Sequence, residues 1–281
     1  MPLPRYIDTH CHLDSEIYAR DLDIVVKHAL EEGVWIVTLG GDYESSKRAV
    51  EIAERYPEGV YAAVGFHPGK VRGDVAADDK LLDISKFAEL AAHPKVVALG
   101  ETGLDYHELP RDARADPKFH VAEQIKANQK QVFSRFLDLS RDLRLPILLH
   151  CRDAHDDMLG MLETWDKTTR GFDSRGIVHC FTGSWKEARR YFNLDFMISV
   201  TGIVTHGSYQ TEVIKKSPGS RLVVESDCPY LTSVPWSIRR NEPSYLPVVA
   251  DAIAAMRGTP PALVAQESTR NALKVFSKIP R

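Results

Sequence analysis

The feature that most constrains the fold is a set of eight short runs rich in β-branched and apolar residues, separated by stretches of helical character. Apolar residues recur three or four positions apart in several of these stretches, as in Val132, Phe133, Phe136 and Leu137 ahead of the fifth run. Eight strand–helix repeats are typical of a single (β/α)8 TIM barrel, an α/β fold, rather than of an open doubly wound sheet. The expected strands are 5–12, 34–40, 60–67, 96–103, 146–151, 176–181, 196–202 and 222–228.

Length and composition agree with one barrel. The chain has 281 residues, of which 43% are apolar, so it can bury a large core and is not disordered as a whole. No internal repeat or linker-like stretch divides it, and we expect one domain over residues 1–281. Its 4 cysteines do not suggest a disulfide framework in a chain of this size.

Net charge and hydropathy argue against a non-specific nucleic-acid-binding protein and a membrane protein. The net charge of −3 is not that of a protein that coats nucleic acid non-specifically, so a nucleic-acid contact would need a local patch. No apolar run approaches the roughly 18 residues of a membrane span, and the first residues lack the apolar core of a signal peptide. We therefore expect a cytoplasmic enzyme that makes no contact with membranes.

Imidazoles and carboxylates stand at the ends of the expected strands. In a barrel these ends surround one mouth, where the active site lies. Each of these residues alone has a structural explanation, such as a hydrogen-bonded core histidine, but their convergence points to metal binding. Four histidines with one Glu and one Asp suit two divalent ions that share a bridging carboxylate. The six residues are His10, His12, Glu101, His150, His179 and Asp227.

Alternation along the strands adds detail. It places Asp8 on the face of His10 and His12, and Glu225 on the face of Asp227. Two carboxylates so close repel each other unless a cation or a proton intervenes. Each cysteine lies one residue from a candidate ligand and should point the other way, as a small buried side chain.

Other residues at the mouth suit an anionic substrate. His67 precedes a Pro-Gly turn on the rim, and Arg152 lies on the face of His150, where its guanidinium can bind a phosphate in a bidentate manner. The alternatives are a loop cap for His67 and a salt bridge for Arg152. Arg239 and Arg240 are a weaker indication, because charge runs are usually solvated faces.

Aromatic residues form a further group. Those near the mouth can stack on a base, although packing is the commoner role for such residues. The group comprises Tyr230, Trp236, Tyr245 and Trp185.

These motifs together resemble the TatD family of metal-dependent deoxyribonucleases, which belongs to the amidohydrolase-like barrels. The resemblance extends from Tyr6 to about Asn271, with the motifs in order and at the family's spacing. They are DTHCHLD (8–14), GFHPG (65–69), GETGLDY (100–106), LPILLHCRDA (145–154), IVHCFTGS (177–184), ESDCPYL (225–231) and RRNEPSYL (239–246).

The resemblance implies a role for each site residue. One metal ion would be held by His10, His12, Glu101 and Asp227, and a second by Glu101, His150 and His179. His67 and Arg152 match positions that face the scissile phosphate, and Asp227 and Glu101 would be the catalytic pair. The ions are Mg, Mn or Zn, and the sequence leaves their identity open, since histidines favour the softer metals.

The expected function is hydrolysis of DNA phosphodiester bonds, with a 3′-5′ exonuclease on single-stranded ends as the mode. A hydroxide activated by two metal ions would attack phosphorus while Asp227 orients it or takes its proton. DNA is the expected substrate, no obligate protein partner is evident, and nothing requires more than a monomer. The alternatives are a carbonyl or ester hydrolase on the same barrel, such as a D-aminoacyl-tRNA deacylase, and a non-enzymatic binding scaffold.

The sequence departs from the family pattern in two places. Segment 107–128 is longer than is usual and could form a lid, with Arg111, Arg114, Lys118 and Lys126 available to a nucleic-acid backbone. The stretch SVPWSIRR lacks the Arg-Gly-Lys motif that is common in the family before Arg-Asn-Glu-Pro. Both departures bear on substrate preference.

Overall fold

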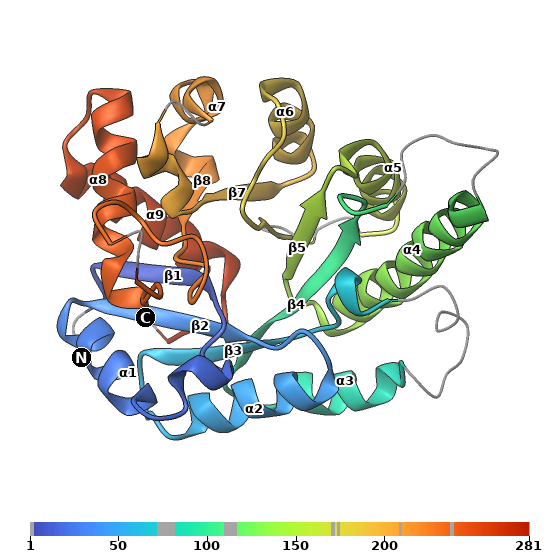
Figure 1. Ribbon diagram of the computed structural model, residues 1–281, viewed down its shortest axis with the longest axis horizontal. Coiled ribbons are helices and arrows are strands. Elements are labelled where there is room, and N and C mark those ends of the chain that lie inside the picture. The colour runs from blue at the N-terminus through green and yellow to red at the C-terminus, as the bar shows by residue number, and fades with distance from the viewer. Residues whose placement is uncertain are drawn as a thin grey trace.

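Eight parallel strands in sequence order form the centre of the molecule, as the expected TIM barrel requires (Figure 1). A computed structural model describes residues 3–71, 82–109, 117–169, 172, 175–207, 210–236 and 239–280. The strands are β1 (Tyr6–Cys11), β2 (Val34–Leu39), β3 (Val60–Val64), β4 (Val96–Asp105), β5 (Ile147–Arg152), β6 (Gly176–Val178), β7 (Phe196–Val200) and β8 (Leu222–Val224).

Helices surround the strands (Figure 1). Helix α6 begins at a capping box, in which the side chains of Ser184 and Glu187 each accept the other's backbone N–H. The helices are α1 (Leu22–Glu31), α2 (Tyr43–Glu54), α3 (Ile84–Ala91), α4 (Pro117–Leu143), α5 (His155–Asp166), α6 (Trp185–Asn193), α7 (Thr211–Lys216), α8 (Leu246–Arg257) and α9 (Pro261–Val275).

Two apolar clusters make the core. The larger lies between strands and helices, and a second, inner cluster joins side chains from the strands, Ile7, Val37 and Met197 among them. Phe276 and Ile279, just beyond α9, are buried in this inner cluster. Because the strands are covered on both faces, they read as nearly continuous apolar runs, which is why the sequence predicts them well.

The closure between β8 and β1, here called the β8–β1 seam, differs from the other strand pairs. Ladders join each strand to the next from β1 to β8. At the seam, isolated hydrogen bonds link the two strands: Thr9 Oγ1 donates to the Val224 carbonyl over 3.2 Å. Beyond β8, the Asp227 N–H donates to the His10 carbonyl over 2.9 Å.

Helix α9 supports the seam by hydrogen bonds to both of its strands. The Val224 N–H donates to Ser268 Oγ over 3.0 Å. Thr269 Oγ1 donates to the Arg5 carbonyl over 2.9 Å, just before β1 begins. The last helix of the barrel therefore joins its first and last strands.

Several expected strands end earlier than the sequence indicates. His67, His179 and Asp227 lie on the loops just beyond β3, β6 and β8, still at the C-terminal mouth. Among the described residues, none of the helices has the length and apolarity needed to cross a membrane. The single-domain boundary and the cytoplasmic location remain predictions.

Candidate metal centre

The six predicted ligands come together at the barrel mouth, with the Glu101 carboxylate between them. Its oxygen Oε2 lies 3.4 Å from His10 Nε2 and 3.6 Å from His12 Nε2. Its other oxygen, Oε1, lies 2.7 Å from His150 Nδ1. One carboxylate thus faces two separate groups of imidazoles, which is the arrangement a bridging ligand needs.

The first group has the spacing of a single ion site. His10 Nε2 and His12 Nε2 are 3.2 Å apart. Asp227 Oδ1 lies 3.6 Å from the first of these nitrogens and 3.7 Å from the second. Four ligands at about 2.1 Å from a tetrahedral ion stand roughly 3.4 Å from one another, so these residues fit one ion.

The second group is built around Glu101 Oε1. His179 Nε2 is 3.8 Å from this oxygen, and His67 Nε2 is 3.5 Å from it. His67, Glu101 and His150 also form one of the groups of possible metal ligands among the described residues. His179 stacks on His10, with ring centroids 3.6 Å apart, so the two groups are in direct contact.

Burial prepares the imidazoles to act as ligands. It lowers the pKa of His10 and lowers that of His12 to about 3, so both rings are neutral. Burial, together with Glu101 and Glu225, raises the pKa of Asp227 to about 8, since nothing nearby offsets a further negative charge fully. The neutral His10 and His12 rings beside the Glu101 and Asp227 carboxyl groups suit a divalent cation, and the mixed nitrogen and oxygen donors favour Zn or Mn over an all-oxygen ion.

The backbone around Glu101 depends on glycine. Gly100 has φ +136°, and a Cβ there would lie 2.6 Å from the Leu148 carbonyl oxygen. The register of the β4–β5 pair shifts between Leu99 and Thr102. This bulge aims the Glu101 side chain into the mouth, which gives the Gly-Glu motif a structural reason.

His67 is arranged as a hydrogen-bond donor. Its Nδ1 accepts the Gly69 N–H over 2.9 Å, which places the ring proton of the neutral form on Nε2. An Nε2–H can donate to a phosphoryl oxygen but cannot ligate a metal at that nitrogen. The geometry is therefore compatible with the predicted substrate-facing role, which remains a prediction.

Two carboxylates that the sequence did not single out as functional orient the histidines. Glu225 Oε1 lies 2.8 Å from His179 Nδ1, and Asp105 Oδ2 lies 3.0 Å from His150 Nε2. Burial disfavours the charge on His179, but Glu225 and Asp227 outweigh it and raise its pKa to about 10. A carboxylate behind a ligating histidine fixes its ring, and the sequence signal was only that Glu225 shares a face with Asp227.

Asp8 is not among the residues that face Glu101, although alternation predicts it beside His10 and His12. The β1–β2 register shifts between Asp8 and Cys11, which turns the carboxylate aside. Its two oxygens accept the N–H and the hydroxyl of Ser226, over 2.8 and 2.5 Å. Asp8 thus fastens the β8–β1 seam from the mouth.

The predicted basic residues have different environments. Arg152 is exposed at the end of β5, on the rim. Arg240 is paired with Asp21 and Glu242, so it stabilises the loop after β8.

Much of segment 107–128 belongs to α4 rather than to a loop, because this helix begins at Pro117. In the segment, Lys126 pairs with Glu123 over 2.7 Å. Arg111 and Arg114 lie outside the described residues, and the side chain of Lys118 is not described. The lid therefore remains a prediction.

Comparison with known proteins decides the family. The family model described as "TatD related DNase" matches residues 7–277. The chain belongs to the TatD family. It is a hydrolase that acts on ester bonds, and its relatives are named as nucleases and metal-dependent hydrolases.

Relatives cover almost the whole chain. A Bacillus subtilis protein named "Uncharacterized metal-dependent hydrolase YabD" is 39% identical, over 96% of this chain and 98% of that protein. The Escherichia coli protein named "3'-5' ssDNA/RNA exonuclease TatD" is 32% identical, over 96% of this chain and 98% of its own. The crystal structure of the Escherichia coli TatD homologue YjjV superposes with a TM-score of 0.82 at 29% identity, over 98% of this chain and 99% of that one.

Proposed function

We propose that this TatD-family hydrolase removes nucleotides from the 3′ end of single-stranded DNA by two-metal hydrolysis. The observation that carries the proposal is the Glu101 carboxylate, which turns one oxygen to His10 and His12 and the other to His150. The names of the relatives, which include 3′-5′ exonucleases acting on single-stranded DNA and RNA, support the substrate class.

The ligand assignment follows the two groups. His10, His12, Glu101 and Asp227 would hold one ion; Glu101, His150 and His179 would hold the other. When bound, the ions act as Lewis acids, making water nucleophilic at neutral pH and offsetting charge on the phosphoryl group. The ions are Mg, Mn or Zn, and the imidazole-rich donor set favours the latter two.

The remaining steps belong to side chains of the mouth. Asp227 lies beside His10 and His12 and is placed to orient the attacking water and to accept its proton. His67 donates from Nε2 to a non-bridging oxygen of the phosphate. Arg152, exposed on the rim, binds the other oxygens as negative charge develops.

An exposed aromatic ring supports a preference for unpaired DNA. Tyr230 is 61% exposed, and its ring centroid lies 6.1 Å from that of His12. Trp236 and Tyr245 stack on each other with centroids 4.4 Å apart, so each already has an aromatic neighbour on one face. The Tyr230 ring can therefore stack on a base that has left its duplex.

The deciding experiment is a paired assay on chelated and re-metallated protein. Release of nucleotides from single-stranded DNA is followed with Mg, Mn or Zn, beside hydrolysis of a D-aminoacyl-tRNA. We expect DNA cleavage in the wild type, none in Glu101→Ala, and a lower bound-metal content in that variant. Deacylation without DNA cleavage would contradict the proposal and move the substrate to a carbonyl compound.

Arg152→Ala separates substrate binding from metal binding. We expect a 10- to 100-fold lower kcat/KM for DNA, because one charged contact to the phosphate is lost, with unchanged metal content. Arg189→Ala, which removes an exposed arginine on α6, is the matched control. Loss of metal in Arg152→Ala would show that the arginine supports the metal centre instead.

A further inference from the structure

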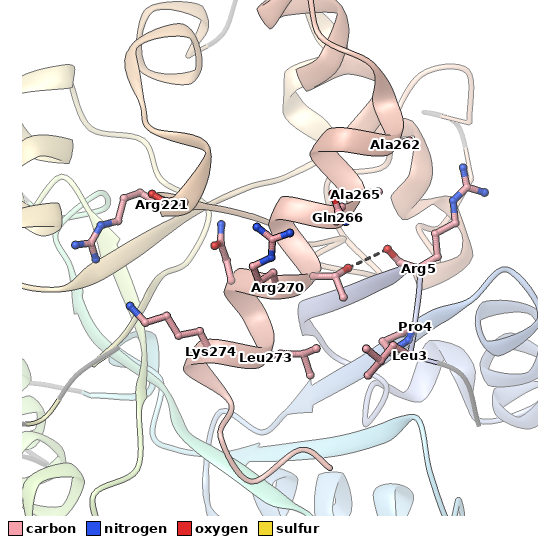
Figure 2. A pocket seen from close by; sticks show the side chains of 13 residues that line it. Leu3, Pro4, Arg5, Arg221, Ala262, Ala265, Gln266, Arg270, Leu273 and Lys274 are labelled. Atoms are coloured by element: carbon pink, nitrogen blue, oxygen red, sulfur yellow. Dashed lines mark hydrogen bonds between the residues drawn. The ribbon is translucent and has the colours of Figure 1, made fainter. Parts of the chain in front are cut away.

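A cavity lies at the N-terminal end of the strands, between α9, the segment before β1 and the turn before β8. Its volume is about 840 Å³, which is in the size range of small-molecule sites. Figure 2 shows Arg270 and Lys274 of α9 in its wall, with Arg221 on one side and Arg5 on the other.

This cavity, here called the α9 pocket, is strongly cationic. Arg5, Arg221, Arg270 and Lys274 line it, and no carboxylate is among the described residues that do so. Arg270 and Lys274 are exposed and one helical turn apart. Arg221 is held in place by Asp195, over 2.9 Å, so its charge is partly balanced from behind.

Apolar groups complete the pocket. Leu273 and Ala265 are buried side chains of α9 that line it, and Leu3, which lines it from the segment before β1, is 59% exposed. A simple inorganic anion would use the cations but leave this apolar surface in water. A ligand with a charged phosphate and a flat apolar body would use both.

We propose that the α9 pocket binds a nucleoside phosphate, with the phosphate among the arginines and lysine and the base against the apolar wall. The inference goes beyond the proposed DNA hydrolysis and does not depend on it. The pocket stands at the opposite end of the strands from the metal centre, since Arg5 precedes β1 and Arg221 precedes β8, whose far ends lead to the metal-centre residues His10 and Asp227.

The position of the pocket indicates that a bound ligand would stabilise the fold. It lies at the β8–β1 seam, where Thr269 holds the Arg5 carbonyl and Asn271 donates to the carbonyls of Gly219 and Leu222, each over 2.7 Å. Arg5 and Arg221 lie on opposite sides of α9 (Figure 2), so a ligand on the wall of α9 would contact the helix that holds both strands of the seam. Because binding to the folded state alone stabilises it, the ligand should raise the unfolding temperature.

The test uses the full chain with its metals and the probe deoxyadenosine monophosphate, measured by isothermal titration calorimetry and thermal unfolding. The wild type is compared with Arg270→Ala/Lys274→Ala. The matched control is Lys186→Ala/Arg189→Ala, which removes one lysine and one arginine that are exposed on α6. Glu101→Ala serves as a background in which phosphate binding at the metal centre is impaired.

We expect the probe to bind the wild type and Glu101→Ala alike at this pocket, and to raise their unfolding temperatures. Affinity should fall at least tenfold in Arg270→Ala/Lys274→Ala and stay unchanged in the α6 control. Deoxyadenosine and inorganic phosphate should each bind at least tenfold more weakly than the monophosphate. Undiminished binding in the α9 variant, no binding in Glu101→Ala, or equal binding of inorganic phosphate would overturn the proposal.

Discussion

The two ends of the barrel differ in the sign and the burial of their charged side chains. At the mouth, His10, Glu101 and Asp227 are all buried, and the buried Glu225 carboxyl group lies close to them. At the other end, Arg270 and Lys274 stay exposed. Buried charge is costly unless a partner offsets it, whereas solvated charge costs little. The mouth is thus prepared for cations held tightly, and the opposite end attracts anions from solution.

The same two strands connect these ends. β1 and β8 lead into the mouth through His10 and Asp227. Helix α9 binds both strands: Thr269 donates to Arg5, just before β1, and Ser268 accepts from Val224, the last residue of β8. In barrels of this type, chemistry resides at the C-terminal ends of the strands, while the N-terminal ends serve stability. Substitutions of the candidate metal ligands should therefore lower activity, whereas substitutions that break contacts of the seam should lower stability.

The largest effect is expected for Asp227→Asn at the mouth. The substitution keeps the size of the side chain but removes a charged ligand and the proton acceptor. We expect kcat/KM for single-stranded DNA to fall by about 10³-fold or more, with weaker binding of one ion. Steady-state kinetics and metal analysis check this, and activity within tenfold of the wild type would contradict the assigned role.

Asp8→Ala should have the next largest effect, which is a loss of stability. It leaves the buried N–H and hydroxyl of Ser226 without their acceptors, so we expect the free energy of unfolding to fall by about 3 kcal/mol. Asp8→Asn keeps one acceptor oxygen and should cost less. Urea unfolding of both variants measures the difference; equal stability of Asp8→Ala and wild type would mean that the seam at the mouth is held by other contacts.

Glu225→Ala tests the carboxylate behind His179. The ring would lose the partner that fixes its orientation, and we expect metal affinity to fall 10- to 100-fold, as is usual for such orienting residues. Glu225→Gln keeps an acceptor and should recover part of the loss. Competition with a chelator gives the affinities, and unchanged values in both variants would assign Glu225 a purely structural role.

Ser268→Ala, which removes a contact between α9 and β8, has the smallest expected effect. One buried backbone N–H, that of Val224, would lose its acceptor, which costs about 1–2 kcal/mol in the free energy of unfolding. Metal content and kcat should stay at wild-type values. A large loss of metal in this variant would contradict the prediction, because it would show that this contact also supports the metal centre.

The sequence predicts the barrel and the set of ligands for a common reason. Strands buried on both faces appear as apolar runs, and a polar residue at the end of such a run must lie at the mouth. The order of the strands is confirmed, and the six ligand candidates lie together; their roles as ligands remain predictions. The TatD resemblance is confirmed by the family model.

What the sequence does not reveal depends on distant partners or small shifts in register. Asp8 shares a face with His10 by alternation, but the register shift between Asp8 and Cys11 sends it to Ser226. Asp105 is an ordinary strand end until β5 brings His150 beside it. The ion pair of Arg240 with Asp21 joins residues far apart in the chain, which no local pattern indicates.

The support that α9 gives to the seam also has a consequence for the order of folding. Thr269 and the buried Phe276 come late in the sequence, yet Thr269 holds the residue before the first strand and Phe276 fills the interior of the barrel. During synthesis, the N-terminal strands therefore emerge from the ribosome before the α9 residues that they contact in the folded barrel. The nascent chain should depend on chaperones until α9 emerges, and a stop codon before Pro261 should yield an aggregating product rather than a weakened enzyme.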